Sequence, residues 1–128
     1  MESVSRQPAF EEESEAYTLF ERGLEFLRHQ HPAQAAMLLA KALRLEPGKN
    51  SIREALGRAE FASGRYGRAA EHFAAIVAVS PDGDYAHYAL GRSLLKLGRG
   101  GEAQAHLRLA CALRPASRLY REALLRQG

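Results

Sequence analysis

The chain has 128 residues, of which 46% are hydrophobic and 26% are charged, a composition close to that of ordinary globular domains. This length allows one domain with its own core, and this composition excludes wholesale disorder. The formal charge of +3 is small for a dedicated nucleic-acid binder, and no apolar run is long enough to span a membrane.

The N-terminal segment 1–14 is acidic and is predicted to be a disordered tail. Residues 1–21 hold six acidic residues and one arginine, whereas the rest of the chain holds nine acidic and 17 basic residues. The segment lacks the apolar stretch of a secretory signal, and a single cysteine permits no disulfide within the chain. We therefore expect a cytoplasmic protein, and the abundance of arginine and alanine favours a bacterial source.

Helices are predicted along the rest of the chain, with no strands, because apolar residues recur at helical spacing between glycine and proline breaks. One stretch shows apolar residues at i, i+4, i+7 and i+8 followed by a proline that ends the helix: Ala69, Phe73, Ile76, Val77 and Pro81. The predicted ranges, in chain order, are 15–29, 33–46, 50–63, 67–80, 84–97, 101–114 and 118–127.

The sequence repeats itself every 34 residues, which defines repeats 16–49, 50–83 and 84–117 without insertions. Small residues and helix breakers recur in phase: Gly23, Gly57 and Gly91; Ala35, Ala69 and Ala103; Pro47, Pro81 and Pro115. Small side chains at a helix crossing let the two backbones approach closely. A single helix pair cannot bury its own apolar face, so the repeats must stack, and 118–127 is expected to cap the last one.

The repeat resembles that of the tetratricopeptide repeat family. The matching residues are the Leu-Gly pairs at 56–57 and 90–91, the recurring alanines, Phe73 and the three prolines. The first aromatic position of the family pattern is instead held by Leu19, Arg53 and His87. The resemblance implies an all-α fold, a right-handed solenoid of three helix-turn-helix units with a C-terminal capping helix over residues 15–128. It also implies a concave groove lined by the first helix of each unit.

Projecting the family geometry places aromatic, acidic and basic residues together in this groove: Tyr17, Phe20, Leu24, Arg28, Glu54, Arg58, Tyr85, Tyr88, Arg92 and Lys96. Tyrosine and arginine combine apolar area with hydrogen bonding, which favours a role in recognition. We expect the following to face solvent: Tyr17, Tyr85, Tyr88, Arg58 and Arg92. A second interpretation stays open for Leu27, Phe61 and Leu95, which could simply fill space between helices.

Candidate catalytic and metal chemistry is weak. The five histidines are interpreted as surface or groove-edge residues, because a metal site needs three or four converging ligands. Cys111 stands where the other repeats have Leu43 and Val77, so it is interpreted as a small buried residue rather than a nucleophile. We therefore expect that the protein is not an enzyme and that it binds no cofactor, no metal and no small-molecule substrate.

The resemblance and the groove composition together predict a protein–protein interaction module with an adaptor or scaffold role. Its partner would be a protein or peptide segment with acidic and aromatic character. Two alternatives stay open: a small chaperone for an exported protein, similar to those of type III secretion, and a nucleic-acid binder, which the acidic tail disfavours. The family's carboxylate clamp is absent, because its positions here hold Phe20, Leu24, Ala55, Tyr85 and Ala89. A further hypothesis is that residues 1–13 occupy the groove of their own or a neighbouring molecule and compete with the partner for it.

Overall fold

The computed structural model describes residues 14–126 and forms seven α-helices and no strand within them. The helices are α1 (Glu15–Arg28), α2 (Pro32–Leu45), α3 (Asn50–Ala62), α4 (Tyr66–Val79), α5 (Asp84–Lys96), α6 (Gly100–Leu113) and α7 (Arg118–Leu125). The predicted all-α class is confirmed, and the helix ends agree with the predicted ranges within two residues.

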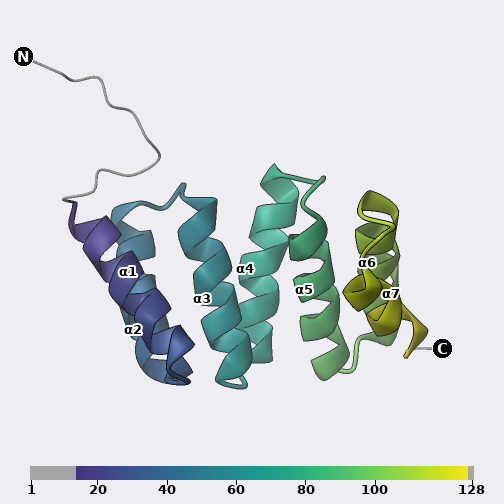
Figure 1. Ribbon diagram of the computed structural model, residues 1–128, viewed down its shortest axis with the longest axis horizontal. Coiled ribbons are helices and arrows are strands. Elements are labelled where there is room, and N and C mark those ends of the chain that lie inside the picture. Colours follow the sequence, from purple (N-terminus) through teal and green to yellow (C-terminus); the bar gives the residue numbers. More distant parts are fainter. Residues whose placement is uncertain (1–13, 127–128) are drawn as a thin grey trace, which may run out of the picture.

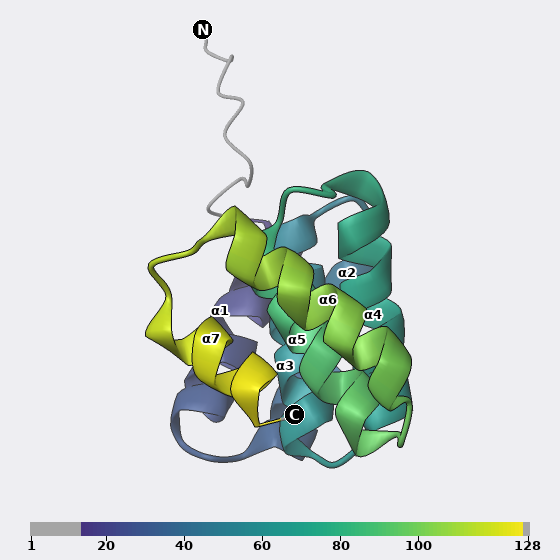
Figure 2. The same ribbon diagram turned by 90° about the vertical axis from the view of Figure 1, so that its right-hand side faces the viewer.

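The helices stand side by side as a row of antiparallel pairs (Figure 1). The first helices α1, α3 and α5 lie toward one face of the row, and the second helices α2, α4 and α6 lie toward the other (Figures 1 and 2). Each helix packs mainly on its neighbours in the sequence, as expected for a stack of repeats. The last helix, α7, lies across the end of the row and packs on α6.

The two helices of each repeat meet closely at the repeated glycine. In each repeat, a Cβ atom on this glycine would lie 2.6–2.8 Å from a side-chain carbon of the second helix. The pairs in contact are Gly23 with Leu39, Gly57 with Phe73 and Gly91 with Leu107. The three partners are almost completely buried, so the small residue makes room for the largest side chains of the core.

The turn inside each repeat closes on one residue in the left-handed conformation. This residue is Gln30, Gly64 or Gly98, with φ of 66°, 82° and 77° respectively. The following amide then donates back to a carbonyl of the first helix, as in His31 N–H to Phe26 O at 2.8 Å. Glycine adopts this conformation without a steric penalty, whereas Gln30 does not.

The core is divided into layers that lie between successive repeats. One cluster joins repeats 1 and 2 and includes Leu39 and Leu56, and a second joins repeats 2 and 3 around Phe73 and Leu90. The third lies between repeat 3 and α7 and includes Tyr120. Every repeat therefore depends on its neighbour to cover its apolar face.

The position at which the chain departs from the family pattern has a structural role in this protein. Arg53, His87 and Arg121 occupy this same position in successive units, and all contact the carbonyl oxygen of the proline that precedes their helix. These contacts are Arg53 to Pro47 at 3.3 Å, His87 to Pro81 at 2.8 Å and Arg121 to Pro115 at 2.7 Å. The polar side chains tie each first helix to the turn before it, which the sequence pattern did not reveal.

The cap α7 follows the register of a first helix but ends differently. Ala123 stands one full repeat after Ala89, and Leu125 stands one full repeat after Gly91. Ala123 is buried like its counterpart, whereas Leu125 is 76% exposed. No second helix packs on α7 within the described chain, and 118–125 caps the stack.

The boundary of the helical domain lies slightly earlier than predicted. The side chain of Ser14 accepts a hydrogen bond from the Tyr17 amide at 3.0 Å and so caps α1, which removes Ser14 from the predicted tail. The remaining tail, 1–13, lies outside the described residues, as does its proposed competition for the groove. In the part of the chain that the structure describes, no helix is both long and apolar enough to cross a membrane.

Candidate functional site

A pocket of about 200 Å³ opens between α3 and α5, on the face of the first helices. Its lining comes from α3, α4 and α5: Arg58, Phe61, Phe73, Tyr85, Tyr88, Ala89 and Arg92. This volume is below the range of about 300–1,000 Å³ that is usual for small-molecule sites. The pocket therefore fits one inserted side chain better than a cofactor.

Arg92 of α5 contacts α3 across the pocket. Its guanidinium carbon lies 4.7 Å from the centre of the Phe61 ring on α3 and 5.9 Å from the Tyr88 ring on α5. A cation over an aromatic face is attracted by the ring quadrupole, and this attraction holds the guanidinium over the pocket wall. Within residues 14–126, neither Arg92 nor the exposed Arg58 forms an ion pair, so both charges are available to an acidic group.

The two tyrosines of α5 are less exposed than predicted. Tyr88 is only 7% exposed, so the expectation that it faces solvent was wrong. Its ring is covered by Tyr120 of α7, which stacks on it with a centroid distance of 4.9 Å. Tyr85 is half-buried, packs edge-on against Phe73, and burial raises its pKa. Both tyrosines contribute aromatic wall to the pocket rather than free side chains.

Asp84, the first residue of α5, holds α7 in place next to the pocket. The Tyr120 hydroxyl donates to Asp84 Oδ2 at 2.7 Å, and Arg114 Nε donates to the same oxygen at 3.0 Å. The hydrogen bond from Tyr120 is the largest cause that lowers the pKa of Asp84, and the charge of Arg114 adds to it against the opposing effect of burial. The carboxylate therefore stays ionised and keeps accepting both hydrogen bonds near neutral pH.

The other predicted groove residues do not line this pocket. Phe20 and Leu24 are half-buried and pack against the core cluster between repeats 1 and 2. Tyr17 and Glu54 are half-buried on α1 and α3. Lys96 lies at the other end of α5, with its ammonium 5.7 Å from the Tyr66 ring.

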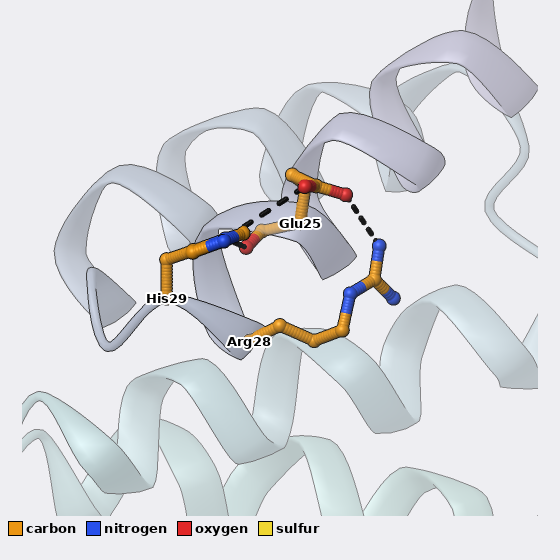
Figure 3. A network of polar contacts seen from close by, with 3 residues as sticks. All are labelled: Glu25, Arg28 and His29. Atoms are coloured by element: carbon orange, nitrogen blue, oxygen red, sulfur yellow. Dashed lines mark hydrogen bonds and ion pairs between the residues drawn. The ribbon is translucent and has the colours of Figure 1, made fainter.

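Arg28 is placed at the end of α1, where it pairs within its own helix (Figure 3). Its guanidinium forms a salt bridge with Glu25, and the ring of His29 contacts the Glu25 carbonyl at 2.9 Å. The hydrogen bond from Arg28 and its charge lower the pKa of Glu25. Because all three groups are exposed, solvent screens the charges of this network. Arg28 is paired at the end of α1 and does not line the pocket.

The histidines correct a second expectation. His87 is buried at 3% exposure, not on the surface, and its Nδ1 lies 3.0 Å from Nδ1 of His106 on the next helix. Arg53 and His72 form the equivalent pair one repeat earlier, at 3.5 Å. No group of three or more possible metal ligands gathers among the described residues. Cys111, expected to be buried, is half-buried.

Sequence reasoning missed three parts of the pocket and its surroundings. Phe73 was identified as a core residue, and Ala89 only as a position of the absent clamp, yet both line the pocket. Tyr120 lies in the segment 118–127, for which only a capping role was predicted. The repeat register contained a usable signal for Ala89, because the small residues Ala55, Ala89 and Ala123 recur at this position. The stacking of Tyr120 on Tyr88 joins the cap to a repeat and had no such signal.

Stacked helix pairs with an open pocket on one face define an α-helical repeat protein of the solenoid class. The model of the tetratricopeptide repeat matches residues 20–84 and 54–118, which together span most of the chain. The chain belongs to the tetratricopeptide repeat family.

Solved structures with the same fold support this assignment. The first such domain of Spaghetti (RPAP3), bound to an HSP90 peptide, has a TM-score of 0.83 at 18% identity, over 88% of this chain and 90% of that chain. The Arabidopsis OM64 domain also reaches 0.83 at 18% identity, over 88% and 93%. A mutant of MamA is 28% identical with a TM-score of 0.73, over 77% and 72%. A search of curated proteins found no match.

Proposed function

We propose that the chain is a protein-interaction module that anchors an acidic, aromatic-containing segment at the pocket between α3 and α5. The observation that carries this proposal is the pair of guanidinium groups, Arg58 and Arg92, beside a pocket walled by aromatic rings. The pocket would take one aromatic or aliphatic side chain, and the arginines would pair with neighbouring carboxylates.

The family supports the class of function and leaves the partner open. The similar domain of RPAP3 was solved with an HSP90 peptide, so this fold can present a peptide-binding face. In the present chain, the positions of the carboxylate clamp include Tyr85 and Ala89, which line the pocket instead. The partner would therefore be recognised by an apolar anchor with nearby acidic groups, in an adaptor or scaffold role.

Charge reversal of both arginines tests this proposal. Changing Arg58→Glu together with Arg92→Glu should weaken binding of a synthetic acetyl-Glu-Glu-Phe-Glu-Glu-amide peptide about ten-fold or more, because attraction is replaced by repulsion. The affinity is measured by fluorescence anisotropy or calorimetry. The melting temperature should fall only slightly, since both side chains are exposed and the stability lost is that of the Arg92 contacts with the Phe61 and Tyr88 rings.

A matched control separates local recognition from general attraction. Arg68→Glu with Arg108→Glu makes the same change in net charge at exposed sites on α4 and α6, away from the pocket. We expect this control to keep most of the affinity. An equal loss in both double variants would mean that only net charge matters, and no loss at the pocket would place the site elsewhere.

A further inference from the structure

We propose that α7 controls the binding site from outside the pocket, because Tyr120 positions the aromatic wall of the pocket and couples the affinity of the pocket to the docking of α7. This inference rests on the proposed function of the pocket and assigns it a control element. Tyr120 is a positioning residue: it does not line the pocket, and it acts through Tyr88, which does.

Tyr120 contacts α5 through both the face of its ring and its hydroxyl group. Its face stacks on Tyr88 with 29° between the ring planes, and its hydroxyl donates to Asp84. Asp84 and Tyr88 are four residues apart, so they lie on the same side of α5. Tyr120 is 6% exposed, which leaves its ring little room to take another position.

The rest of α7 adds one small apolar contact, in which Ala123 and Leu124 pack against α6. Only Tyr120 and Ala123 are buried along this helix, while Leu119 and Leu125 are exposed. Its ion pairs, Arg118 and Arg126 with Glu122, all form within or just after the helix itself. The docking of α7 on the stack therefore depends on few contacts: those of Tyr120 with α5, supported by the Arg114–Asp84 ion pair, and an apolar contact of Ala123 and Leu124 with α6.

The position of Tyr88 carries this effect to the pocket. One face of its ring is covered by Tyr120, and Arg92 lies 5.9 Å from its centre. When α7 leaves, the buried Tyr88 ring loses the partner that fixes its tilt, and the Arg92 guanidinium loses one of its two aromatic supports. An occupant of the pocket would favour the docked state of α7, and docked α7 would favour the occupant by the same factor.

Substitutions at the contact separate stacking from hydrogen bonding. Tyr120→Leu removes the ring and should weaken the acetyl-Glu-Glu-Phe-Glu-Glu-amide peptide about five-fold or more. Tyr120→Phe keeps the ring and should recover most of this loss. Asp84→Asn weakens the hydrogen bonds from Tyr120 and Arg114 without changing a residue of the pocket wall. The peptide affinity of this variant should lie between those of Tyr120→Leu and Tyr120→Phe. Leu119→Ala, at an exposed site on the same helix, is the control and should bind as the parent does.

A second readout needs no ligand. The Arg92 side-chain N–H lies close to two aromatic rings, so its proton signal in an NMR spectrum should be shifted by the ring currents of Phe61 and Tyr88. In Tyr120→Leu this signal should move toward its solvent value and exchange faster, while Tyr120→Phe and Leu119→Ala leave it in place. Circular dichroism checks that each variant keeps its helices.

The two readouts distinguish this inference from the proposed function. A parent protein that ignores the peptide, with an Arg92 signal that responds to Tyr120→Leu, would refute the proposed ligand and leave the positioning role standing. An Arg92 signal unchanged in folded Tyr120→Leu would overturn the positioning role, whatever binds. If Tyr120→Leu does not fold, Asp84→Asn gives the same comparison, and an unchanged signal there with α7 released overturns the inference.

Discussion

At Gly57, the absence of a side chain allows α3 to lie against the buried Phe73 ring of α4. A Cβ atom at this position would lie 2.8 Å from the Phe73 ring, closer than real Cβ contacts allow. The same relation holds at Gly23 and Gly91 with leucine partners. The glycine of the repeat is thus required by packing, because its neighbour is a large residue that fills the space between repeats.

Replacing this glycine tests the packing directly. Gly57→Leu should lower the free energy of unfolding by about 1–3 kcal/mol, because Phe73 must leave its position or the helices must separate. Urea denaturation followed by circular dichroism measures the change. Gly67→Leu, where an added Cβ meets nothing within 4 Å, is the control for the loss of a glycine in a helix. Equal stability of Gly57→Leu and the parent would contradict the close crossing.

His72 and His106, which face polar partners on the first helix of their own repeat, predict a pH dependence. Burial and then the neighbouring His87 lower the pKa of His106, while Glu102 opposes this; burial and then Arg53 lower the pKa of His72, while Glu60 and Glu71 oppose it. Each folded pKa lies below the ordinary 6.5, so the unfolded chain takes up protons first as the pH falls.

The contribution of these two histidines to the free energy of unfolding should therefore be fully present above their ordinary pKa of 6.5. It should be lost as the pH falls from about 7 toward about 5.5, before the carboxylates titrate. Thermal melts across this range measure it. Replacing both residues with glutamine, which keeps a hydrogen-bonding group but does not titrate, should flatten the curve. A parent melting temperature that rises on acidification would show that the pKa shifts have the opposite sign.

At the scale of the element, the turn inside each repeat depends on one backbone conformation. Repeats 2 and 3 use Gly64 and Gly98 there, and repeat 1 uses Gln30. An L residue in the left-handed region costs roughly 1–2 kcal/mol, apart from what its side chain gains. Repeat 1 carries this cost in a turn that otherwise has the same hydrogen bonds.

Gln30→Gly should therefore raise the free energy of unfolding by about 1 kcal/mol, partly offset by the larger entropy of glycine in the unfolded chain. Gly64→Ala should lower it by a similar amount, and an added Cβ there meets nothing within 4 Å, so only the backbone can account for the loss. Both changes are measured by denaturation. A Gln30→Gly variant less stable than the parent would show that the glutamine side chain stabilises this turn.

The helices were predictable because the same residue pattern recurs in each repeat. Apolar spacing and the phase of glycine, alanine and proline placed every helix within two residues. The recognition surface was predictable in part: four of the ten predicted groove residues, Arg58, Tyr85, Tyr88 and Arg92, line one pocket. Burial of Tyr88 was not predictable, because the covering ring comes from α7, outside the repeat pattern.

At the scale of the whole molecule, stability is distributed along a row and not around one centre. Helices α2 to α6 each pack on the helix before and the helix after them, with α3, α4 and α5 in the middle of the row, whereas α1 and α7 lie at the ends. In such an array, the free energy of opening is a sum of local terms and contacts between neighbours.

Amide hydrogen exchange should show this distribution. We expect the slowest exchange in α3, α4 and α5, faster exchange in α1, and the fastest in α7, because its buried contacts are few. Exchange followed by mass spectrometry of peptides gives the profile. Equal protection of all seven helices would mean that the described stack opens only as one unit.

The exposed Leu125 has a consequence for building longer versions of this protein. In each repeat, the corresponding residue is a glycine that leaves room for a second helix, and here a leucine takes that room. An extra helix fused after α7 would meet this side chain before it reached the α7 backbone. We therefore expect that extension of the array by one more unit needs Leu125→Gly as its first step, so that the added helix can pack as closely as the second helix of each repeat does.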